Sequence, residues 1–327
     1  MAKLVTIYGG SGFVGRYVAQ KLAAKGWRVR VAVRRPNEAM FVKPYGVPGQ
    51  VEPVLCNIRD DASVAAVMKG ADAVVNCVGT FDWRGRNEFQ AVQAEGAARV
   101  ARAAAAEGVE TLVHISALGI EGDSDSRYAA SKRDGEAAVR EHFPRATILR
   151  PSVVFGPEDG FFNRFAGLSR FGPVLPIFGG STRFQPVYVE DVALAAVKGV
   201  EGEAQGVYEL GGPEVKTLRG WIDVVLASVR RGRLVANLPM RLGRIMAFGF
   251  DMIEAFSLGL IANRILTRDQ VRQLGHDNVV SEGARGLADL GIEPVAPEAV
   301  IDSYLWRFRP NGQFDAIRDS AKNLRAN

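Results

Sequence analysis

The feature that most constrains the fold is a glycine-rich turn near the start of the chain, Gly9-Gly10-Ser11-Gly12-Phe13-Val14-Gly15. It follows the apolar run 4–8 and precedes a segment of helical periodicity, 13–25. Glycines at this spacing let a strand turn sharply into a helix, let the backbone approach a pyrophosphate and let the helix pack on its strand. The turn therefore predicts a strand–turn–helix unit with a dinucleotide across it, its pyrophosphate on the helix N-terminus.

The end of the next strand, 27–35, indicates which dinucleotide. An acidic residue at this place binds the ribose 2′-hydroxyl of NAD(H), whereas an arginine meets the 2′-phosphate of NADP(H). This chain has Arg34 and Arg35 there, and Glu38 follows only after Pro36. The planar guanidinium suits a phosphate dianion, so the sequence favours NADP(H) over NAD(H).

The composition is that of a soluble nucleotide-binding protein. The 327 residues are 47% hydrophobic and 24% charged, which allows a large core and more than one domain. The two cysteines, Cys56 and Cys77, lie in apolar runs and are expected to be inert core thiols. The three histidines are scattered, so we expect no metal site. The net charge of +5 suits an acidic partner or a membrane surface.

Strand-like and helical segments alternate through the first half of the chain. Further strands are expected at 51–58, 71–79, 111–117 and 147–156, and further helices at 61–69, 89–107 and 128–143. This alternation predicts an α/β fold, a Rossmann-type doubly wound parallel sheet with helices on both faces. We expect the nucleotide-binding domain over 1–215, with part of 150–215 contributing to the cleft, and a smaller, mainly helical docking region over 216–327.

A second motif, Tyr128-Ala-Ala-Ser-Lys132, opens the helix that follows the fifth strand. Residues four apart share a helix face, so the ammonium of Lys132 is expected beside the hydroxyl of Tyr128. A neighbouring cation lowers a phenol pKa towards the range of general acid–base catalysis.

With these motifs the chain resembles the short-chain dehydrogenase/reductase superfamily, in its extended or atypical branch. The matches are Gly9-x-x-Gly12-x-x-Gly15, Asn76-Cys-Val-Gly79, Tyr128-x-x-x-Lys132, Arg150-Pro-Ser-Val-Val-Phe-Gly156-Pro157 and Pro186-Val-Tyr-Val-Glu-Asp191-Val-Ala193. The resemblance implies that the tyrosine moves the proton, the lysine binds the nicotinamide ribose, and a hydroxyl at the end of the fifth strand orients the substrate.

The sequence departs from the family pattern at this hydroxyl. The fifth strand ends in Ser116-Ala117, where the family places a serine followed by a catalytic serine or threonine. Ser116 lies one position early, and by strand alternation its side chain points the other way. Loss of the orienting group removes a few kcal/mol of transition-state stabilisation, by analogy with an oxyanion-hole donor. Tyr128, Lys132 and Ser116 are therefore the candidate catalytic residues, vestigial if the protein is silent.

The fold and the resemblance together assign the nucleotide site. The residues expected to hold the nucleotide are Gly9, Gly10, Ser11, Gly12, Phe13, Val14, Gly15, Arg34, Arg35, Asn57, Asp60, Cys77, Val78, Gly79, Ile115, Ser116, Tyr128, Lys132, Pro151 and Val153.

The last third of the chain holds an expected helix within 216–235 and an amphipathic segment, 238–266. Charges interrupt 238–266 too often for a membrane span. It could lie on a membrane or on a partner, or pack on its own domain. The basic run 230–233 is interpreted as a cationic helix cap, and no nucleic acid is expected.

The C-terminal pattern, the arginines after the second strand and the missing hydroxyl resemble the nucleotide-binding accessory-subunit family of respiratory complex I (NADH:ubiquinone oxidoreductase), in its alphaproteobacterial form. The resemblance implies structural NADPH and docking on the peripheral arm, near the membrane and the quinone site. It also implies a peripheral place on the cytoplasmic face of the bacterial inner membrane, and since 1–8 already form the first strand, no signal peptide is expected.

Two hypotheses follow. In the favoured one the protein is a catalytically silent NADP(H)-binding accessory subunit whose partners are other complex I subunits. In the alternative it is an active NADP(H)-dependent oxidoreductase or epimerase that uses Tyr128 and Lys132.

Overall fold

The computed structural model describes residues 2–80, 85–121, 126–243, 245, 272 and 274–314. These residues belong to two compact units, each of which is discontinuous in sequence. Unit 1 takes its described residues from 1–152, 189–211 and 280–294, and unit 2 takes its own from 153–188, 212–279 and 295–327. The boundary of independent domains at residue 215 stays a prediction.

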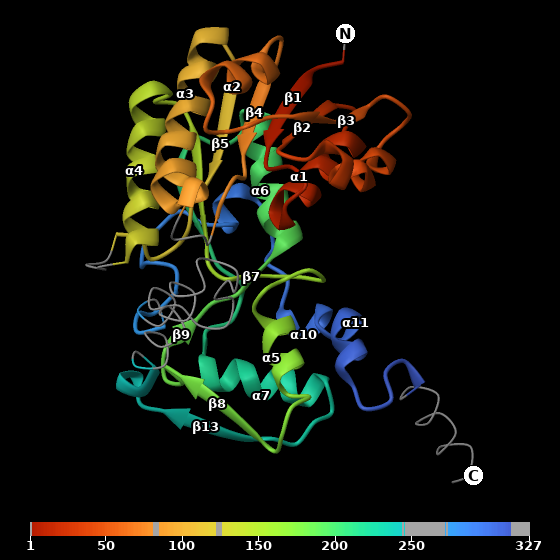
Figure 1. The fold of residues 1–327 in the computed structure, drawn as a ribbon, viewed down its shortest axis with the longest axis vertical. Coiled ribbons are helices and arrows are strands. Elements are labelled where there is room, and N and C mark those ends of the chain that lie inside the picture. Colours follow the sequence, from red (N-terminus) through yellow and green to blue (C-terminus); the bar gives the residue numbers. More distant parts are fainter. Residues whose placement is uncertain are drawn as a thin grey trace. The chain divides into compact units, whose positions relative to one another are not determined.

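Unit 1 is built on a seven-stranded sheet with the order β11-β6-β5-β4-β1-β2-β3, in which every neighbouring pair is parallel (Figure 1). The strands are β1 (Leu4–Tyr8), β2 (Arg28–Val33), β3 (Val51–Leu55), β4 (Ala73–Asn76), β5 (Thr111–Ile115), β6 (Thr147–Pro151) and β11 (Gly206–Leu210). The strand order reverses between β1 and β4, which is where doubly wound sheets bind ligands. The predicted α/β fold class is confirmed.

Helices cover both faces of this sheet because its strands are apolar on both sides. In Figure 1, α1 (Phe13–Ala24) and α6 (Val189–Val200) pack together on one face. The other face carries α2 (Asp61–Met68), α3 (Glu95–Glu107) and α4 (Arg127–His142), which share a buried core with the strands. A π-helical turn, Gln90–Ala94, precedes α3, so the helix predicted over 89–107 changes its hydrogen-bond pattern on the way.

Unit 2 has its own core, with the buried Trp221 at its centre. Its main helices are α5 (Phe162–Leu168) and α7 (Leu218–Ser228), and α10 (Pro297–Val300) and α11 (Asp302–Leu305) follow near the C-terminus. Its strands form pairs: β7 (Val154–Phe155) with β10 (Val187–Tyr188), β9 (Arg183–Phe184) with β12 (Lys216–Thr217), and β8 (Val174–Phe178) with β13 (Leu234–Leu238).

The C-terminal third therefore differs in part from its prediction. A helix lies within 216–235, as predicted, but it ends at Ser228, and the sequence reasoning missed β13. The amphipathic segment 238–266 lies mostly outside the described residues.

Candidate nucleotide site

The glycine turn is so tight that it leaves no room for side chains at its glycine positions. Gly9 has a φ of +75°, a conformation that favours glycine. A Cβ on Gly15 would lie 2.4 Å from the carbonyl oxygen of Gly9, and a Cβ on Gly12 would lie 3.1 Å from the same atom. Arg16 braces the turn by donating to the carbonyls of Ser11 and Gly12. The turn therefore brings the backbone itself to the surface that a ligand would contact.

The N-terminus of α1 is suited to an anion. Gly12 is the N-cap and offers no side chain to the first-turn N–H groups, and the first turn holds no acidic residue. Phe13, Val14 and Gly15 form that first turn. Unpaired N–H donors and the helix dipole at this place attract a phosphate group.

A cavity of about 220 Å³ opens at the carboxyl ends of β1, β2, β3 and β4. Eight of the predicted nucleotide residues line it: Gly9, Ser11, Gly12, Arg34, Asn57, Cys77, Val78 and Gly79. Nine others that the sequence reasoning had not named complete the lining: Tyr8, Ala32, Val33, Cys56, Ile58, Arg59, Thr80, Asn87 and Val92. The cavity lies where the strand order reverses between β1 and β4.

The two arginines after β2 have different surroundings. Arg34 is exposed and lines the cavity. Arg35 instead forms an exposed ion pair with Glu38, with 3.0 Å between its NH1 and Oε1 of the glutamate. Arg34 is thus the better placed of the two for a phosphate at this cavity.

Arg59, which was missed, also lines the cavity. It comes from the turn after β3, and its NH1 donates to the carbonyl of Arg86 at 3.0 Å. Its backbone N–H donates to Oδ1 of Asn57 at 3.2 Å. A signal was present in the sequence, because basic residues follow two neighbouring strands, β2 and β3, whose carboxyl ends meet at one edge of the sheet.

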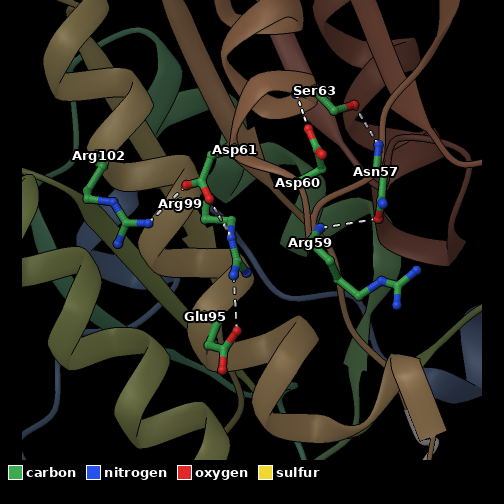
Figure 2. Close-up of polar contacts among 8 residues, drawn as sticks. All are labelled: Asn57, Arg59, Asp60, Asp61, Ser63, Glu95, Arg99 and Arg102. Carbon is green, nitrogen blue, oxygen red and sulfur yellow. Dashed lines mark hydrogen bonds and ion pairs between the residues drawn. The ribbon is translucent and has the colours of Figure 1, made fainter.

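Figure 2 shows how the predicted residues Asn57 and Asp60 are used within the protein. The Asp60 carboxylate caps α2 by accepting from the N–H of Ser63 at 2.6 Å. The hydroxyl of Ser63 accepts from the N–H of Asn57 at 2.9 Å. Asn57 lines the cavity, whereas Asp60 is not among its lining residues. A direct contact of Asp60 with a nucleotide stays a prediction.

Tyr128 and Lys132 lie four residues apart on α4, as predicted. Lys132 is 5% exposed, and its Nζ donates to the carbonyl of Ile115 at the end of β5, at 3.1 Å. Burial lowers the pKa of Lys132 to about 8. The Tyr128 ring packs edge-on against Phe89, with 5.8 Å between the centroids. Neither Tyr128 nor Lys132 is among the residues that line the cavity, so their contact with a nucleotide stays a prediction.

Ser116 follows β5 directly and is buried. Its Oγ has no hydrogen-bond partner among the described residues, and the same is true of Nε2 of the buried His114. An unpaired buried hydroxyl costs free energy unless a ligand or water satisfies it. Ala117, one position later, offers no hydroxyl.

The last two predicted residues flank the boundary between the units. Pro151 ends β6, and its carbonyl accepts from the N–H of Leu118 at 2.9 Å. Val153 belongs to unit 2, so its contact with a nucleotide stays a prediction.

The residues present fit a nicotinamide dinucleotide. The glycine turn, the uncapped α1 and the arginines suit its phosphates, and the orphaned Ser116 hydroxyl and the buried Lys132 suit polar groups of its nicotinamide half.

Comparison with known proteins places the chain in a family. The model of the NAD dependent epimerase/dehydratase family matches residues 5–211. The chain is 33% identical to the mitochondrial NADH dehydrogenase (ubiquinone) 1 alpha subcomplex subunit 9 of Arabidopsis thaliana, over 94% of this chain and 79% of the plant protein. It is 34% identical to the ceramide reductase of Caulobacter vibrioides, over 71% of this chain and 73% of that enzyme.

Solved structures agree in fold. The NADPH-dependent quinone oxidoreductase QOR2 of Escherichia coli, complexed with NADPH, superposes with a TM-score of 0.69 at 17% identity, and the match covers 92% of this chain and 99% of that one. Taken with the family match, these relatives show that the chain belongs to the NAD dependent epimerase/dehydratase family and is related within it to the alpha subcomplex subunit 9 of mitochondrial NADH dehydrogenase.

Proposed function

We propose that the protein is an NADP(H)-binding accessory subunit of a respiratory NADH:ubiquinone oxidoreductase and has no catalytic activity of its own. The observation that carries this proposal is the extent of the match to the Arabidopsis subunit, which covers 94% of the chain and so continues past the family model's limit at residue 211. The match to the ceramide reductase covers only 71% of the chain.

NADP(H) is favoured by the charge of the cavity. Its lining includes Arg34 and Arg59 and, among the residues that the structure describes, no aspartate or glutamate. A 2′-phosphate would find two guanidinium groups there, whereas the 2′-hydroxyl of NAD(H) would find no carboxylate acceptor. Bound nucleotide would then stabilise the folded unit by linkage.

Catalytic silence is supported by the end of β5. Ala117 occupies the position at which the dehydrogenase pattern places the orienting hydroxyl, and the Ser116 hydroxyl is buried. In this role Lys132 and Tyr128 would bind the nucleotide without moving a proton.

The proposed partners are other subunits of the complex, at the cytoplasmic face of the bacterial inner membrane. None of the helices in the described ranges combines the length and the apolar character needed to cross a bilayer. Contact with the membrane through 238–266 stays a prediction, because most of that segment lies outside the described residues.

The proposal is tested in native membranes. Membranes of the source organism are solubilised in mild detergent, separated by size under native conditions and searched for this polypeptide by mass spectrometry. Comigration with NADH dehydrogenase activity in a very large particle is expected. Recovery only as a small soluble species would overturn the proposal.

A second function, NADP(H)-dependent reduction, is favoured by two observations. Tyr128 and Lys132 are both present, and the Caulobacter relative is a reductase. The purified protein, incubated with NADPH deuterated at C4 and a cell extract, decides between them. Stereospecific transfer of deuterium to a metabolite, lost in Tyr128→Phe, would establish the reductase; its absence is expected for a silent subunit.

A further inference from the structure

The β8–β13 pair of unit 2 carries apolar side chains on both faces. Its inner face, with Leu175 and Val235, is buried against α7, which lies alongside the pair in Figure 1. The register sets three apolar pairs on the opposite face: Val174 with Leu234, Pro176 with Ala236 and Phe178 with Leu238. An exposed sheet face normally carries polar residues.

The exposed apolar side chains gather at the start of these strands. Leu234 is 68% exposed and Val174 43%. Leu168 at the end of α5 and Phe171 in the turn before β8 add to this group. Phe171, at 74%, is more exposed than any other large hydrophobic residue described. A group of this kind marks an interaction site more often than a single exposed residue does.

Arginines border this group. Arg230, Arg231 and Arg233 follow α7 and line an open hollow of about 400 Å³, and Arg170 is exposed next to Phe171. Nε of Arg233 donates to the carbonyl of Ser169 at 2.7 Å, and the N–H of Leu234 donates to the carbonyl of Pro173 at 3.0 Å. These two bonds hold the basic loop beside the turn that carries Phe171.

The charge of the hollow is positive. The one carboxylate in its lining is Asp223, which pairs with Arg219 at 3.3 Å. Arg231 and Arg233 use their Nε atoms on backbone carbonyls, and each guanidinium carries further N–H donors. Such groups bind phosphate oxygens in a bidentate manner.

Arg230 occupies an unusual backbone conformation for a residue with a side chain. Its φ of 54° lies in the left-handed region, at the position after a helix that glycine usually fills. A side chain in this conformation costs conformational energy, and such strained positions cluster at functional sites.

We propose that this apolar-basic surface, made of Leu168, Phe171, Val174, Leu234, Arg170, Arg230, Arg231 and Arg233, docks on a bilayer that contains anionic phospholipid. Phe171 and Leu234 enter the boundary between headgroups and acyl chains, and the arginines bind the lipid phosphates. The charge complementarity selects this partner: the surface combines an apolar centre with a cationic border, as interfacial membrane elements do.

The test is cosedimentation of the full-length chain with vesicles of phosphatidylcholine alone or mixed with phosphatidylglycerol. Wild type is expected on the mixed vesicles only, and release by salt is expected because screening weakens the attraction. Phe171→Ser should lower the partition coefficient about tenfold, and Arg233→Gln about fivefold. The controls are Val47→Ser and Arg28→Gln at exposed positions of unit 1, and both variants should bind as wild type does.

Arg230→Gly separates binding from folding. Glycine relieves the left-handed backbone, so the melting temperature should stay unchanged or rise while vesicle binding falls. Three results would overturn the proposal: no binding of wild type to anionic vesicles, equal losses in the unit 1 controls, or a surface that instead joins two copies or an acidic protein in the absence of lipid.

Discussion

The two units differ in how their sheets are covered. In unit 1 helices cover both faces of the parallel sheet, and a cavity opens at the strand ends, with glycines and two arginines among its lining residues. In unit 2 one face of the β8–β13 pair packs on α7, and on the other face Val174 and Leu234 are exposed in the part of the chain that the structure describes. The difference agrees with our two proposals, that unit 1 binds a dinucleotide and that unit 2 docks on a membrane.

The largest effect is expected from a charge buried in unit 1. Arg150 donates from Nε and NH2 to the two carboxylate oxygens of Glu136 at 2.8 and 2.7 Å, and Glu136 is 2% exposed. Arg150→Met should lower the free energy of unfolding by about 3 kcal/mol, because the buried carboxylate of Glu136 keeps only its ion pair with the half-exposed Arg140, at 2.8 Å. Denaturation in urea, followed by circular dichroism, measures this.

An exposed pair of unit 2 is the control. Arg183 lies 2.8 Å from Asp277, and Arg183→Met should cost less than about 1 kcal/mol. In the double variant Arg150→Met/Glu136→Leu much of the lost stability should return, because the buried charge that lost its main partner is gone. A double variant as unstable as Arg150→Met would contradict this account.

Nucleotide should stabilise the two units unequally. At a concentration of about 100 times its dissociation constant, NADPH raises the free energy of unfolding by about 2.7 kcal/mol for any unfolding event that releases the nucleotide. Hydrogen exchange followed by mass spectrometry should therefore slow in β1, β4 and α1 and not in β8 and β13. Equal protection of both units would remove the distinction between them.

Within unit 2, Tyr304→Phe should cost about 2 kcal/mol, because it removes a donor to a buried carboxylate. The Tyr304 hydroxyl donates to Oδ2 of the buried Asp159 at 2.9 Å. Thermal denaturation at several pH values measures the cost. Ser303→Ala, which removes an exposed hydroxyl from the same helix, should stay within about 0.5 kcal/mol.

The pH dependence of Tyr304→Phe follows from Asp159. Burial raises the pKa of Asp159 in the folded protein, so its contribution favours folding at acid pH and is lost as pH rises through the folded pKa. Tyr304→Phe lacks a donor to the charged form of Asp159, so it should lose more stability than wild type as the pH rises. A cost that is independent of pH would argue against Asp159 as the affected group.

The smallest expected effect concerns Lys132. Since its pKa is about 8, the ammonium is charged below that pH and neutral above it. NADPH affinity should weaken by about 1 kcal/mol as pH rises through 8, the difference between a charged and a neutral hydrogen bond. Calorimetric titrations from pH 7 to 9 on wild type and Lys132→Met check this, and the variant should show no such change.

Much of unit 1 could be predicted because its local signals agree with one another. The turn Gly9 to Gly15 needs glycine for steric reasons, and the spacing of its glycines is visible in the sequence. The buried parallel strands appear as apolar runs. Arg34 could be placed by its distance from the turn. Arg59 was missed although a basic residue after the third strand is visible in the sequence, because its place at the cavity depends on two strand ends meeting across the sheet.

Unit 2 was less predictable for a physical reason. β13 is a five-residue strand whose partner β8 lies about sixty positions earlier, so no local pattern reveals the pair. The run 230–233 was interpreted as a helix cap, and it does follow α7. The sequence does not reveal that this run lies beside Phe171, because only the fold brings the loop after α7 next to the turn after α5.

The most direct test of the central claim, that unit 1 holds NADP(H), is calorimetric titration of wild type, Arg34→Ala and Arg35→Ala with NADPH and with NADH. We predict that NADPH binds more tightly to wild type and that Arg34→Ala weakens NADPH by about 1.5–3 kcal/mol with little change for NADH. Arg35→Ala, which breaks only the pair with Glu38, should resemble wild type. Equal affinities for the two nucleotides, or equal losses of both in Arg34→Ala, would contradict the claim.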